Sequence, residues 1–316
     1  MKNINLLYCF DEGYNIQTYA SIYSISKNLE DCNLSIYIIH KNPNTFENYI
    51  SKINQFENVN QVSIYEFRKD LSDYPFLKDS HVSEATYYRL FISEYLPKSL
   101  DHIIYIDSDI FCINNPQYMV NYAVTELLAS HFTISAATEM YKNKFDGDIF
   151  TKLQLSNERY FNAGVMVIDD QKWQKSVNIN SLLQLLKKNS NTVNNWDQDL
   201  LNIYFDGKYL ELTSFLNFRI YYPIPIQFFK NNSLFIHFAG NHKPWTIEGS
   251  LDEVSKIYFD LLDELSVKNF ALKIKSRKIR AFTYVLKKLL TFIKTKKNRR
   301  LLANALKTIF KKNKDD

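Results

Sequence analysis

The fold class expected for this chain follows from the segment His102-Ile103-Ile104-Tyr105-Ile106-Asp107-Ser108-Asp109. Its first five residues, rich in β-branched and aromatic side chains, predict a short buried strand. Two carboxylates follow, one residue apart, where that strand ends. In open α/β sheets, ligands bind at the carboxyl ends of the strands. We therefore expect Asp107 and Asp109 to converge on one divalent cation, which could neutralise a diphosphate.

The composition predicts one sizeable hydrophobic core. The chain has 316 residues, of which 46% are hydrophobic and 15% aromatic, and only 6 Gly and 7 Pro, which excludes a fibrous or low-complexity class. The three cysteines, Cys9, Cys32 and Cys112, are odd in number and lack CxxC spacing, so we expect reduced thiols in a cytoplasmic protein. We also expect no signal peptide and no bilayer-spanning run of ~20 apolar residues.

Strand-like and helix-like segments alternate over the first part of the chain, which is typical of an α/β fold. We expect a catalytic domain over residues 1–250 and a helical extension over 251–316. No glycine-rich phosphate loop is present. The expected strands are Ile4 to Phe10, Leu34 to Ile39, Val62 to Tyr65, His102 to Ile106, Ala163 to Ile168 and Leu234 to Ile236; the expected helices are Asn15 to Leu29, Ser83 (as N-cap) to Tyr95, Ser181 to Lys188 and one starting at Leu200.

The C-terminal extension is strongly basic. Residues 268–316 carry 17 Lys and Arg against 2 Asp and Glu, although the net charge of the whole chain is only +5. Apolar residues such as Ile279, Phe282 and Leu286 recur every three or four positions between the basic ones. This pattern is typical of a helix that lies in a membrane interface, so we expect residues 268–316 to bind an anionic membrane surface. Nucleic acid is the less favoured partner, because the rest of the chain is acidic and contains no recognisable nucleic-acid module.

Five motifs occur in a fixed order along the chain. They are Ser83-Glu84-Ala85-Thr86-Tyr87-Tyr88-Arg89-Leu90, Tyr105-Ile106-Asp107-Ser108-Asp109, Tyr160-Phe161-Asn162-Ala163-Gly164-Val165, Trp196-Asp197-Gln198-Asp199-Leu200-Leu201-Asn202, and His237-Phe238-Ala239-Gly240 with Lys243-Pro244-Trp245. Together they resemble the family 8 glycosyltransferases, from about Ile4 to Trp245. The resemblance is greatest to the bacterial enzymes that build lipo-oligosaccharide and lipopolysaccharide. It implies a GT-A fold, with a mixed sheet flanked by helices, and retaining transfer of a hexose from a UDP-sugar.

The resemblance implies a metal site and a diphosphate site. Asp107, Asp109 and His237 would be the metal ligands, and two carboxylates with one imidazole suit Mn²⁺, with Mg²⁺ as the alternative. Gly240 would let the backbone approach a phosphate, and Lys243 would supply a positive charge. Taken alone, His237 would more often be a strand-end histidine with its hydrogen bonds satisfied, so its assignment depends on the Gly240 and Lys243 that follow. The alternative for Lys243, a solvated surface lysine, is less favoured within this motif.

The resemblance also implies how the donor is bound. Asp11 would accept a hydrogen bond from uracil, Tyr14 would offer its ring for stacking, and the backbones of Cys9 and Phe10 could contribute. Ser108 would contact the donor from within the metal motif.

The sugar pocket would be formed by three of the five motifs. Arg89 would bridge the metal motif and a sugar hydroxyl; the alternative is a structural ion pair with Asp107. Asn162 would bind the sugar by hydrogen bond, and Ala163 with Gly164 would leave room for it.

Mechanism depends on Asp197, Gln198 and Asp199. Retaining hydrolases use two carboxylates about 5 Å apart, one of them a nucleophile. The resemblance instead puts the amide of Gln198 beside the anomeric carbon, where it would stabilise the oxocarbenium of a front-face substitution. Asp197 would hold donor hydroxyls, and Asp199 would cap the next helix. Glu139 is a candidate on the acceptor side, because relatives that transfer galactose have an Asp in that region.

Together these features predict a cytoplasmic enzyme, peripheral on the inner face of the membrane. It would move galactose or glucose from a UDP-hexose to a lipid-linked glycan. Two alternatives stay open. One is a UDP-glucosyltransferase with a protein or soluble polysaccharide acceptor, and the other is an inactive, membrane-bound module that binds nucleotide sugars.

Overall fold

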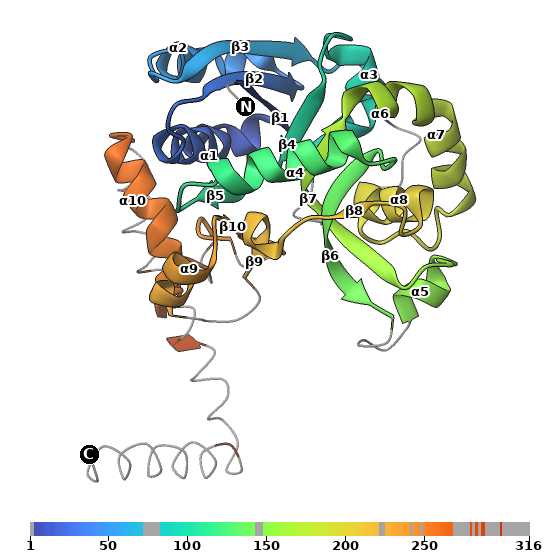
Figure 1. Ribbon diagram of the computed structural model, residues 1–316. Helices are drawn as coiled ribbons and strands as arrows, with labels where there is room; N and C mark the ends of the chain where they lie inside the picture. Colours follow the sequence, from blue (N-terminus) through green and yellow to red (C-terminus); the bar gives the residue numbers. More distant parts are fainter. Residues whose placement is uncertain are drawn as a thin grey trace. The chain divides into compact units, whose positions relative to one another are not determined.

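The strand before Asp107 lies at the centre of a seven-stranded mixed sheet, in the order β3-β2-β1-β4-β7-β6-β8 (Figure 1). The computed structural model describes residues 3–71, 83–142, 148–220, 225–240, 243–246 and 249–267, together with residues 279, 282, 283, 286, 287 and 298. The strands of this sheet are β1 (Asn3–Phe10), β2 (Asn33–His40), β3 (Val59–Glu66), β4 (His102–Ile106), β6 (Ile134–Tyr141), β7 (Arg159–Asp169) and β8 (Leu210–Glu211).

The sheet is mixed, and its last pair, β6 with β8, is parallel. Strands β3, β2, β1 and β4 run parallel, whereas β7 is antiparallel to both β4 and β6. A second sheet of three strands contains β5 (Ile110–Cys112), β10 (Phe235–His237) and β9 (Phe218–Arg219) in the order β5-β10-β9. Residues 107–109 therefore connect β4 of the large sheet to β5 of the small one. The expected mixed α/β fold is confirmed.

Successive side chains of a strand point to opposite faces of the sheet, so buried residues lie on both faces of the large sheet. Leu7 and Cys9 of β1 belong to a buried cluster that also contains Tyr88, Leu200 and Phe205. The intervening residues of β1 are also buried and point to the opposite face. Helices α1 (Asn15–Asn28) and α4 (Gln117–Ala129) lie in front of the sheet in Figure 1, and α7 (Ile179–Lys188) and α8 (Trp196–Phe205) contact each other.

The helix expected from Ser83 to Tyr95 is mostly a 3₁₀ helix. Ser83 does cap it, but Glu84–Phe91 is 3₁₀, and only α3 (Ile92–Tyr95) is α-helical. A 3₁₀ helix has three residues per turn, so Thr86 and Arg89 lie on one face. Both of these side chains contact Asp197.

Helix α8 begins at Trp196, earlier than the start expected at Leu200, so the polar motif is its first turn. Asp199 is not the cap of a following helix. From inside α8 its carboxylate accepts hydrogen bonds from the backbone N–H groups of Asn194 and Asn195, at 2.7 and 2.9 Å. A negative charge at a helix N-terminus is favourable, so Asp199 stabilises the start of α8 from within its first turn. The other described helices of this part of the chain are α2 (Glu47–Ile53), α5 (Asp148–Lys152), α6 (Asp170–Ser176) and α9 (Ile226–Asn232).

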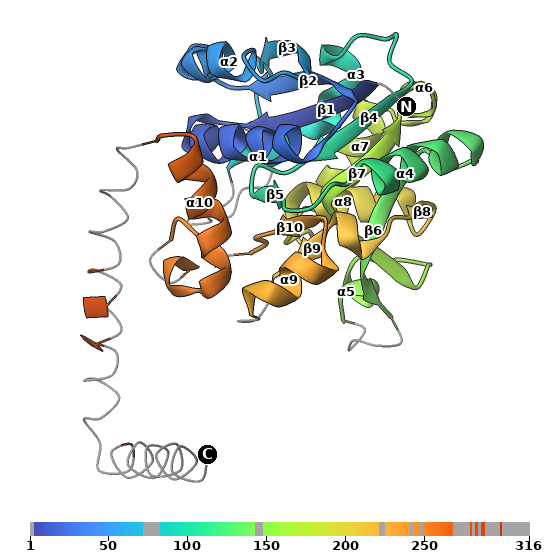
Figure 2. The same cartoon turned by 60° about the vertical axis from the view of Figure 1, so that its left-hand side comes forward.

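The chain divides into two compact units, Met1–Asn241 and His242–Asp316. The described part of the second unit contains α10 (Lys256–Glu264), visible in Figure 2, where Tyr258 packs against Trp245 with ring centroids 5.2 Å apart. No helix in the described part of the chain is both long and apolar enough to cross a membrane. Most of the basic tail expected to bind membrane, residues 268–316, lies outside the described residues.

Candidate active site

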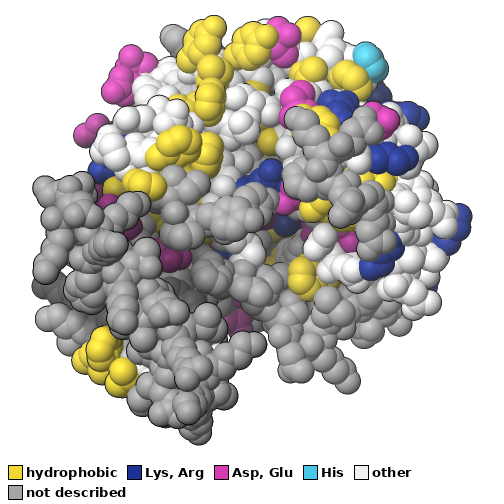
Figure 3. All heavy atoms as spheres, turned by 90° about the horizontal axis from the view of Figure 1, so that it is seen from below, with side chains coloured by type: hydrophobic (Ala, Val, Ile, Leu, Met, Phe, Trp, Pro, Cys, Tyr) yellow, Lys and Arg dark blue, Asp and Glu magenta, His cyan; other side chains and the backbone are white. Residues whose placement is uncertain are grey.

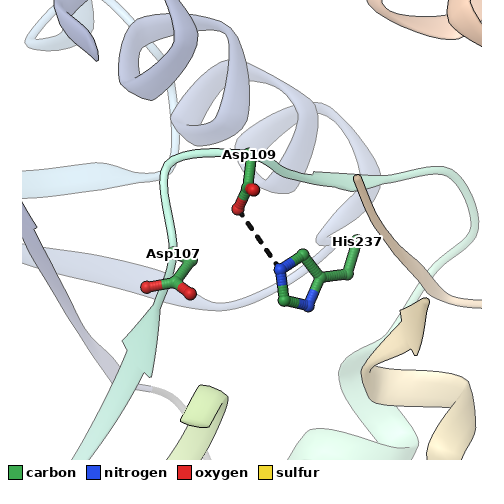
Figure 4. A group of neighbouring side chains, drawn as sticks. All are labelled: Asp107, Asp109 and His237. Carbon is green, nitrogen blue, oxygen red and sulfur yellow. Dashed lines mark ion pairs between the residues drawn. The ribbon is translucent and has the colours of Figure 1, made fainter. Parts of the chain in front are cut away.

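The two sheets bring the predicted metal ligands together. Candidate ligand atoms of Asp107, Asp109 and His237 all lie within 4.8 Å of one another. The imidazole of His237 faces Asp109, with Nε2 3.5 Å from Oδ1, and Asp107 lies at the end of β4 (Figure 4). The cause is strand pairing, because β10 runs antiparallel to β5 and places His237 opposite Ile110, one residue after Asp109. These are oxygen and imidazole ligands that a divalent metal such as Mn²⁺ accepts.

The pairing of β6 with β7 is interrupted beside the candidate site. Ala136 pairs with Met166 but Ala137 pairs with Asn162, so the residues between them on β7 have no partner on β6. The backbone groups of Ala163 and Gly164 bond to the site instead. Ala163 N–H donates to Gln198 Oε1 at 3.0 Å, Gly164 N–H donates to Asn162 Oδ1 at 3.0 Å, and Gly164 O accepts from Asp107 N–H at 2.8 Å. The irregularity of these strands therefore orients three predicted site residues.

Gln198 is fully hydrogen-bonded within the site. Its Oε1 accepts from Ala163 N–H and from Asn162 Nδ2, the latter at 3.1 Å. Its Nε2 donates to Glu139 Oε2 at 3.1 Å and to the Tyr160 hydroxyl at 3.0 Å. The backbone N–H of Ala163 must donate, so it fixes which end of the amide is oxygen.

Glu139 lies at a second register shift between β6 and β7 and faces the same network. Its Oε2 accepts from both Gln198 and Asn162, and its Oε1 forms an ion pair of 2.8 Å with Arg219 of β9. Arg219 could not be selected from the sequence, because it belongs to no recognisable motif.

Arg89 lies between two predicted site carboxylates. Its side chain is only 6% exposed, and it pairs with Asp107 Oδ1 at 3.0 Å and with Asp197 Oδ2 at 2.8 Å. It also donates to Ala163 O at 2.7 Å and stacks on the ring of Tyr105. Burial by itself lowers the pKa of Arg89, but the carboxylates of Asp107 and Asp197 outweigh this and raise it. The structural ion pair with Asp107 is therefore present.

Asp197 is buried beside Arg89, with its carboxylate also accepting a hydrogen bond from the Thr86 hydroxyl. Burial raises the pKa of Asp197, and the Arg89 guanidinium partly opposes that rise. Whether Asp197 holds donor hydroxyls, as predicted, stays a prediction.

The residues predicted to bind the nucleotide lie around the end of β1. Asp11 caps a short 3₁₀ turn (Glu12–Tyr14) by accepting from Gly13 N–H at 2.9 Å. Burial, followed by the carboxylates of Asp109 and Asp107, raises the pKa of Tyr14, so its hydroxyl lies in the field of the metal motif. Cys9 is buried nearby, and Ser108 Oγ accepts from Thr18 Oγ1 at 2.7 Å. Ser108 thus anchors the metal motif to α1.

Gly240 and Lys243 fall in different units. Gly240 has a φ of +73°, in the left-handed region that favours glycine, and among the described residues a Cβ there would meet no atom within 4 Å. Its approach to a phosphate stays a prediction. Lys243 belongs to the second unit, and its role at the diphosphate stays a prediction.

Gly164→Ala is expected to damage the metal site. A Cβ at Gly164 would lie 2.4 Å from His237 Cε1 and 2.9 Å from Asn162 Oδ1, so both side chains must move. We expect a loss of about 1–3 kcal/mol in the free energy of unfolding, measured by urea titration. We also expect weaker Mn²⁺ binding, measured by electron paramagnetic resonance.

Val165→Ile is the matched control for this prediction. Val165 is 1% exposed and neighbours Gly164 on β7, but its side chain points to the other face of the strand. The added methylene should cost stability without changing Mn²⁺ affinity. Equal Mn²⁺ affinity in Gly164→Ala and wild type would contradict the close approach of Gly164 to His237.

The sequence model of glycosyl transferase family 8 matches residues 5–249. The chain belongs to this family. This confirms the resemblance predicted from the five motifs. The protein is therefore a glycosyltransferase.

The curated relatives include enzymes of lipopolysaccharide synthesis. The lipopolysaccharide 1,2-glucosyltransferase of Escherichia coli K12 is 27% identical over 261 residues, covering 78% of this chain and 75% of the relative. The lipopolysaccharide 1,3-galactosyltransferase of Salmonella typhimurium LT2 is 26% identical over 170 residues, covering 51% and 49%.

Solved structures confirm the GT-A fold. The galactosyltransferase LgtC, in complex with donor and acceptor sugar analogs, superposes with a TM-score of 0.67 at 18% identity, covering 83% of this chain and 96% of LgtC. The glycosyltransferase GlyE of Streptococcus pneumoniae TIGR4 has a TM-score of 0.60 at 18% identity, covering 87% and 64%.

Proposed function

We propose that this protein is a metal-dependent, retaining hexosyltransferase. It moves galactose or glucose from a UDP-hexose to a hydroxyl of a lipopolysaccharide or lipo-oligosaccharide glycan. The observation that carries the proposal is the convergence of Asp107, Asp109 and His237 within 4.8 Å, next to the hydrogen-bonded amide of Gln198. The named activities of the bacterial relatives support the substrate class.

Asp107, Asp109 and His237 would hold the metal, and their two carboxylates and one imidazole fit Mn²⁺ or Mg²⁺. A bound divalent metal would supply Lewis-acid stabilisation of the diphosphate charge. Tyr14, Asp11 and Ser108 would surround the nucleotide on the β1 side, and Lys243 would add positive charge. Arg89 holds Asp107 in position through its ion pair, so the metal motif is oriented before the donor binds.

Retention of configuration is explained best by front-face substitution. The Gln198 carbonyl oxygen already accepts two hydrogen bonds, which makes an amide oxygen a still weaker nucleophile. The bond from the anomeric carbon to the diphosphate breaks, and the bond to the acceptor oxygen forms on the same face. The proton of the acceptor hydroxyl passes to the departing diphosphate. Gln198 would stabilise the positive charge that develops on the sugar ring.

Glu139 stays the residue proposed for the acceptor side. Arg219 and the two amides hold its carboxylate at the edge of the Gln198 network. Asn162 would contact the donor hexose from the same network, beside the small residues Ala163 and Gly164.

The direct test is UDP release from a panel of UDP-sugars, measured with EDTA and with added Mn²⁺. We expect turnover of UDP-galactose or UDP-glucose that requires metal and rises when a lipopolysaccharide core acceptor is added. Absence of UDP release with every donor and acceptor would favour the inactive binding module. Metal-independent turnover would contradict the assigned role of Asp107, Asp109 and His237.

We propose that residues 268–316 bind the protein to the anionic inner face of a bacterial membrane. The described residues Ile279, Phe282 and Leu286 are helical, spaced three and four residues apart, and 67%, 68% and 44% exposed. On the face shown in Figure 3, acidic side chains of described residues lie beside basic ones. The sequence of residues 268–316, with 17 Lys and Arg against 2 Asp and Glu, supports contact of this segment with anionic lipid.

Vesicle binding tests the membrane proposal. We expect the full chain to sediment with phosphatidylglycerol vesicles at low salt, but not with phosphatidylcholine vesicles or at 1 M salt. Phe282→Ser, which removes an exposed apolar side chain and no charge, should weaken binding. Equal sedimentation with both lipids would contradict an electrostatic docking role.

A further inference from the structure

We propose that Asn217 is the positioning residue that sets the tautomer of His237 and links the metal ligands to Gln198. This inference rests on the proposed function. Asn217 is 2% exposed and lies immediately before β9, where its backbone N–H donates to Ser214 O at 3.1 Å. Strand β9 runs beside β10 and pairs Arg219 with His237, so the Asn217 side chain is held next to the imidazole.

The orientation of the Asn217 amide follows from a fixed donor. Gly164 N–H, a backbone group that can only donate, bonds to Asn162 Oδ1 at 3.0 Å. The Asn217 group 2.9 Å from that same oxygen must therefore be its Nδ2, which donates. Consequently Asn217 Oδ1 is the atom that faces His237 Nδ1, at 2.8 Å.

The tautomer of His237 follows in turn. Asn217 Oδ1 can only accept, so Nδ1 of His237 carries the proton. In the neutral ring Nε2 then presents its lone pair, on the side where Asp109 Oδ1 lies 3.5 Å away. A metal-ligating histidine usually has its other ring nitrogen fixed by such a partner, which sets both the tautomer and the ring orientation.

Asn217 is also linked, through Asn162, to Gln198, whose amide is proposed to act at the sugar. Asn162 Oδ1 accepts from Asn217, and Asn162 Nδ2 donates to Gln198 Oε1 at 3.1 Å. His237 is thus joined to Gln198 by a continuous chain of side-chain hydrogen bonds through Asn217 and Asn162. A substitution at Asn217 therefore has two separable consequences, one for the imidazole of His237 and one for the amide of Gln198.

Two substitutions separate these consequences. Asn217→Ala removes both the acceptor for His237 and the donor for Asn162. Asn217→Asp keeps an oxygen for His237 Nδ1–H but places a second acceptor against Asn162 Oδ1. The control is Asn5→Ala, because Asn5 is also buried and donates one hydrogen bond, to His102 O at 3.0 Å, at the opposite end of β1 and β4.

The first measurement is the tautomer of His237 by long-range ¹⁵N–¹H NMR of the imidazole at pH 8, without metal. We expect a protonated Nδ1 in the wild type, in Asn217→Asp and in Asn5→Ala, and a mixture of tautomers in Asn217→Ala. A protonated Nε2 with bare Nδ1 in the wild type would overturn the proposal. So would an unchanged tautomer in Asn217→Ala.

The second measurement is Mn²⁺ affinity by electron paramagnetic resonance, followed by UDP release. Asn217→Ala should bind Mn²⁺ about 10–100-fold more weakly than wild type. Asn217→Asp should bind Mn²⁺ within a few-fold of wild type but turn over more slowly, because the link to Gln198 is broken. Equal loss of Mn²⁺ affinity in both variants would indicate a merely structural role and overturn the proposal. A wild-type protein that shows the expected tautomer but binds no Mn²⁺ would instead refute the proposed function.

Discussion

Replacing Asp109 by asparagine is expected to lower the rate of UDP release by about a thousandfold or more. Asp109 is 6% exposed, and its carboxylate lies with Asp107 and His237 at the end of β4. Loss of one of two carboxylates from a metal site removes several kcal/mol of charge stabilisation from a developing diphosphate, and about 4 kcal/mol corresponds to a thousandfold in rate. The measurement is UDP release from the preferred UDP-hexose at saturating Mn²⁺.

Asp31→Asn is the matched control for Asp109→Asn. Asp31 is exposed and has a φ of 50°, a conformation that asparagine tolerates well, so the control makes the same change of charge away from the site. We expect wild-type turnover in this control. Turnover within tenfold of wild type in Asp109→Asn would contradict the metal assignment.

Replacing Arg89 by methionine is expected to destabilise the fold by about 3–5 kcal/mol, because two carboxylates then lose their shared positive partner. The side chain of Arg89 is 6% exposed, and those of Asp107 and Asp197 are 27% and 3% exposed. Methionine has a similar length but cannot replace the ion pairs or the hydrogen bond to Ala163 O. The free energy of unfolding from urea titration provides the measurement.

The loss of stability in Arg89→Met should depend on pH. Burial already raises the pKa of Asp197, and removal of the Arg89 guanidinium raises it further. A carboxyl group whose folded pKa exceeds its unfolded pKa contributes stability below the unfolded pKa, and that contribution is lost as pH rises through the folded pKa. The destabilisation should therefore be larger at pH 8 than at pH 5.

The double variant Arg89→Met with Asp197→Asn provides the control for this argument. It removes the buried negative charge together with its partner, so it should recover part of the lost stability and most of the pH dependence. A pH-independent loss in Arg89→Met, unchanged in the double variant, would show that the guanidinium acts through packing alone.

The sequence predicted the elements of the fold well where one pattern dominates. Continuous apolar stretches fixed β1, β2 and β4, because a strand buried on both faces needs no alternation with polar residues. The carboxylates after β4 could be predicted as ligands from the same segment, because ligands bind at the carboxyl ends of strands in open α/β sheets. The 3₁₀ geometry of Glu84–Phe91 could not be predicted from the sequence, because the spacing of its apolar residues also fits an α-helix.

Local patterns and the order of the motifs were enough to predict the α/β class and the family, and they supplied the candidate site residues. Which other groups lie around those candidates depends on tertiary structure. Thr86 and Tyr160 lie inside two of the motifs but were not among the predicted site residues, and they complete the hydrogen bonds of Asp197 and Gln198. Asn217 and Arg219 contact His237 and Glu139, yet they lie in a stretch without a distinctive pattern. Their roles arise from a register break between β6 and β7 and from the pairing of β9 with β10. Both are long-range backbone arrangements, and a buried polar group is satisfied by whatever partner such pairing brings near it.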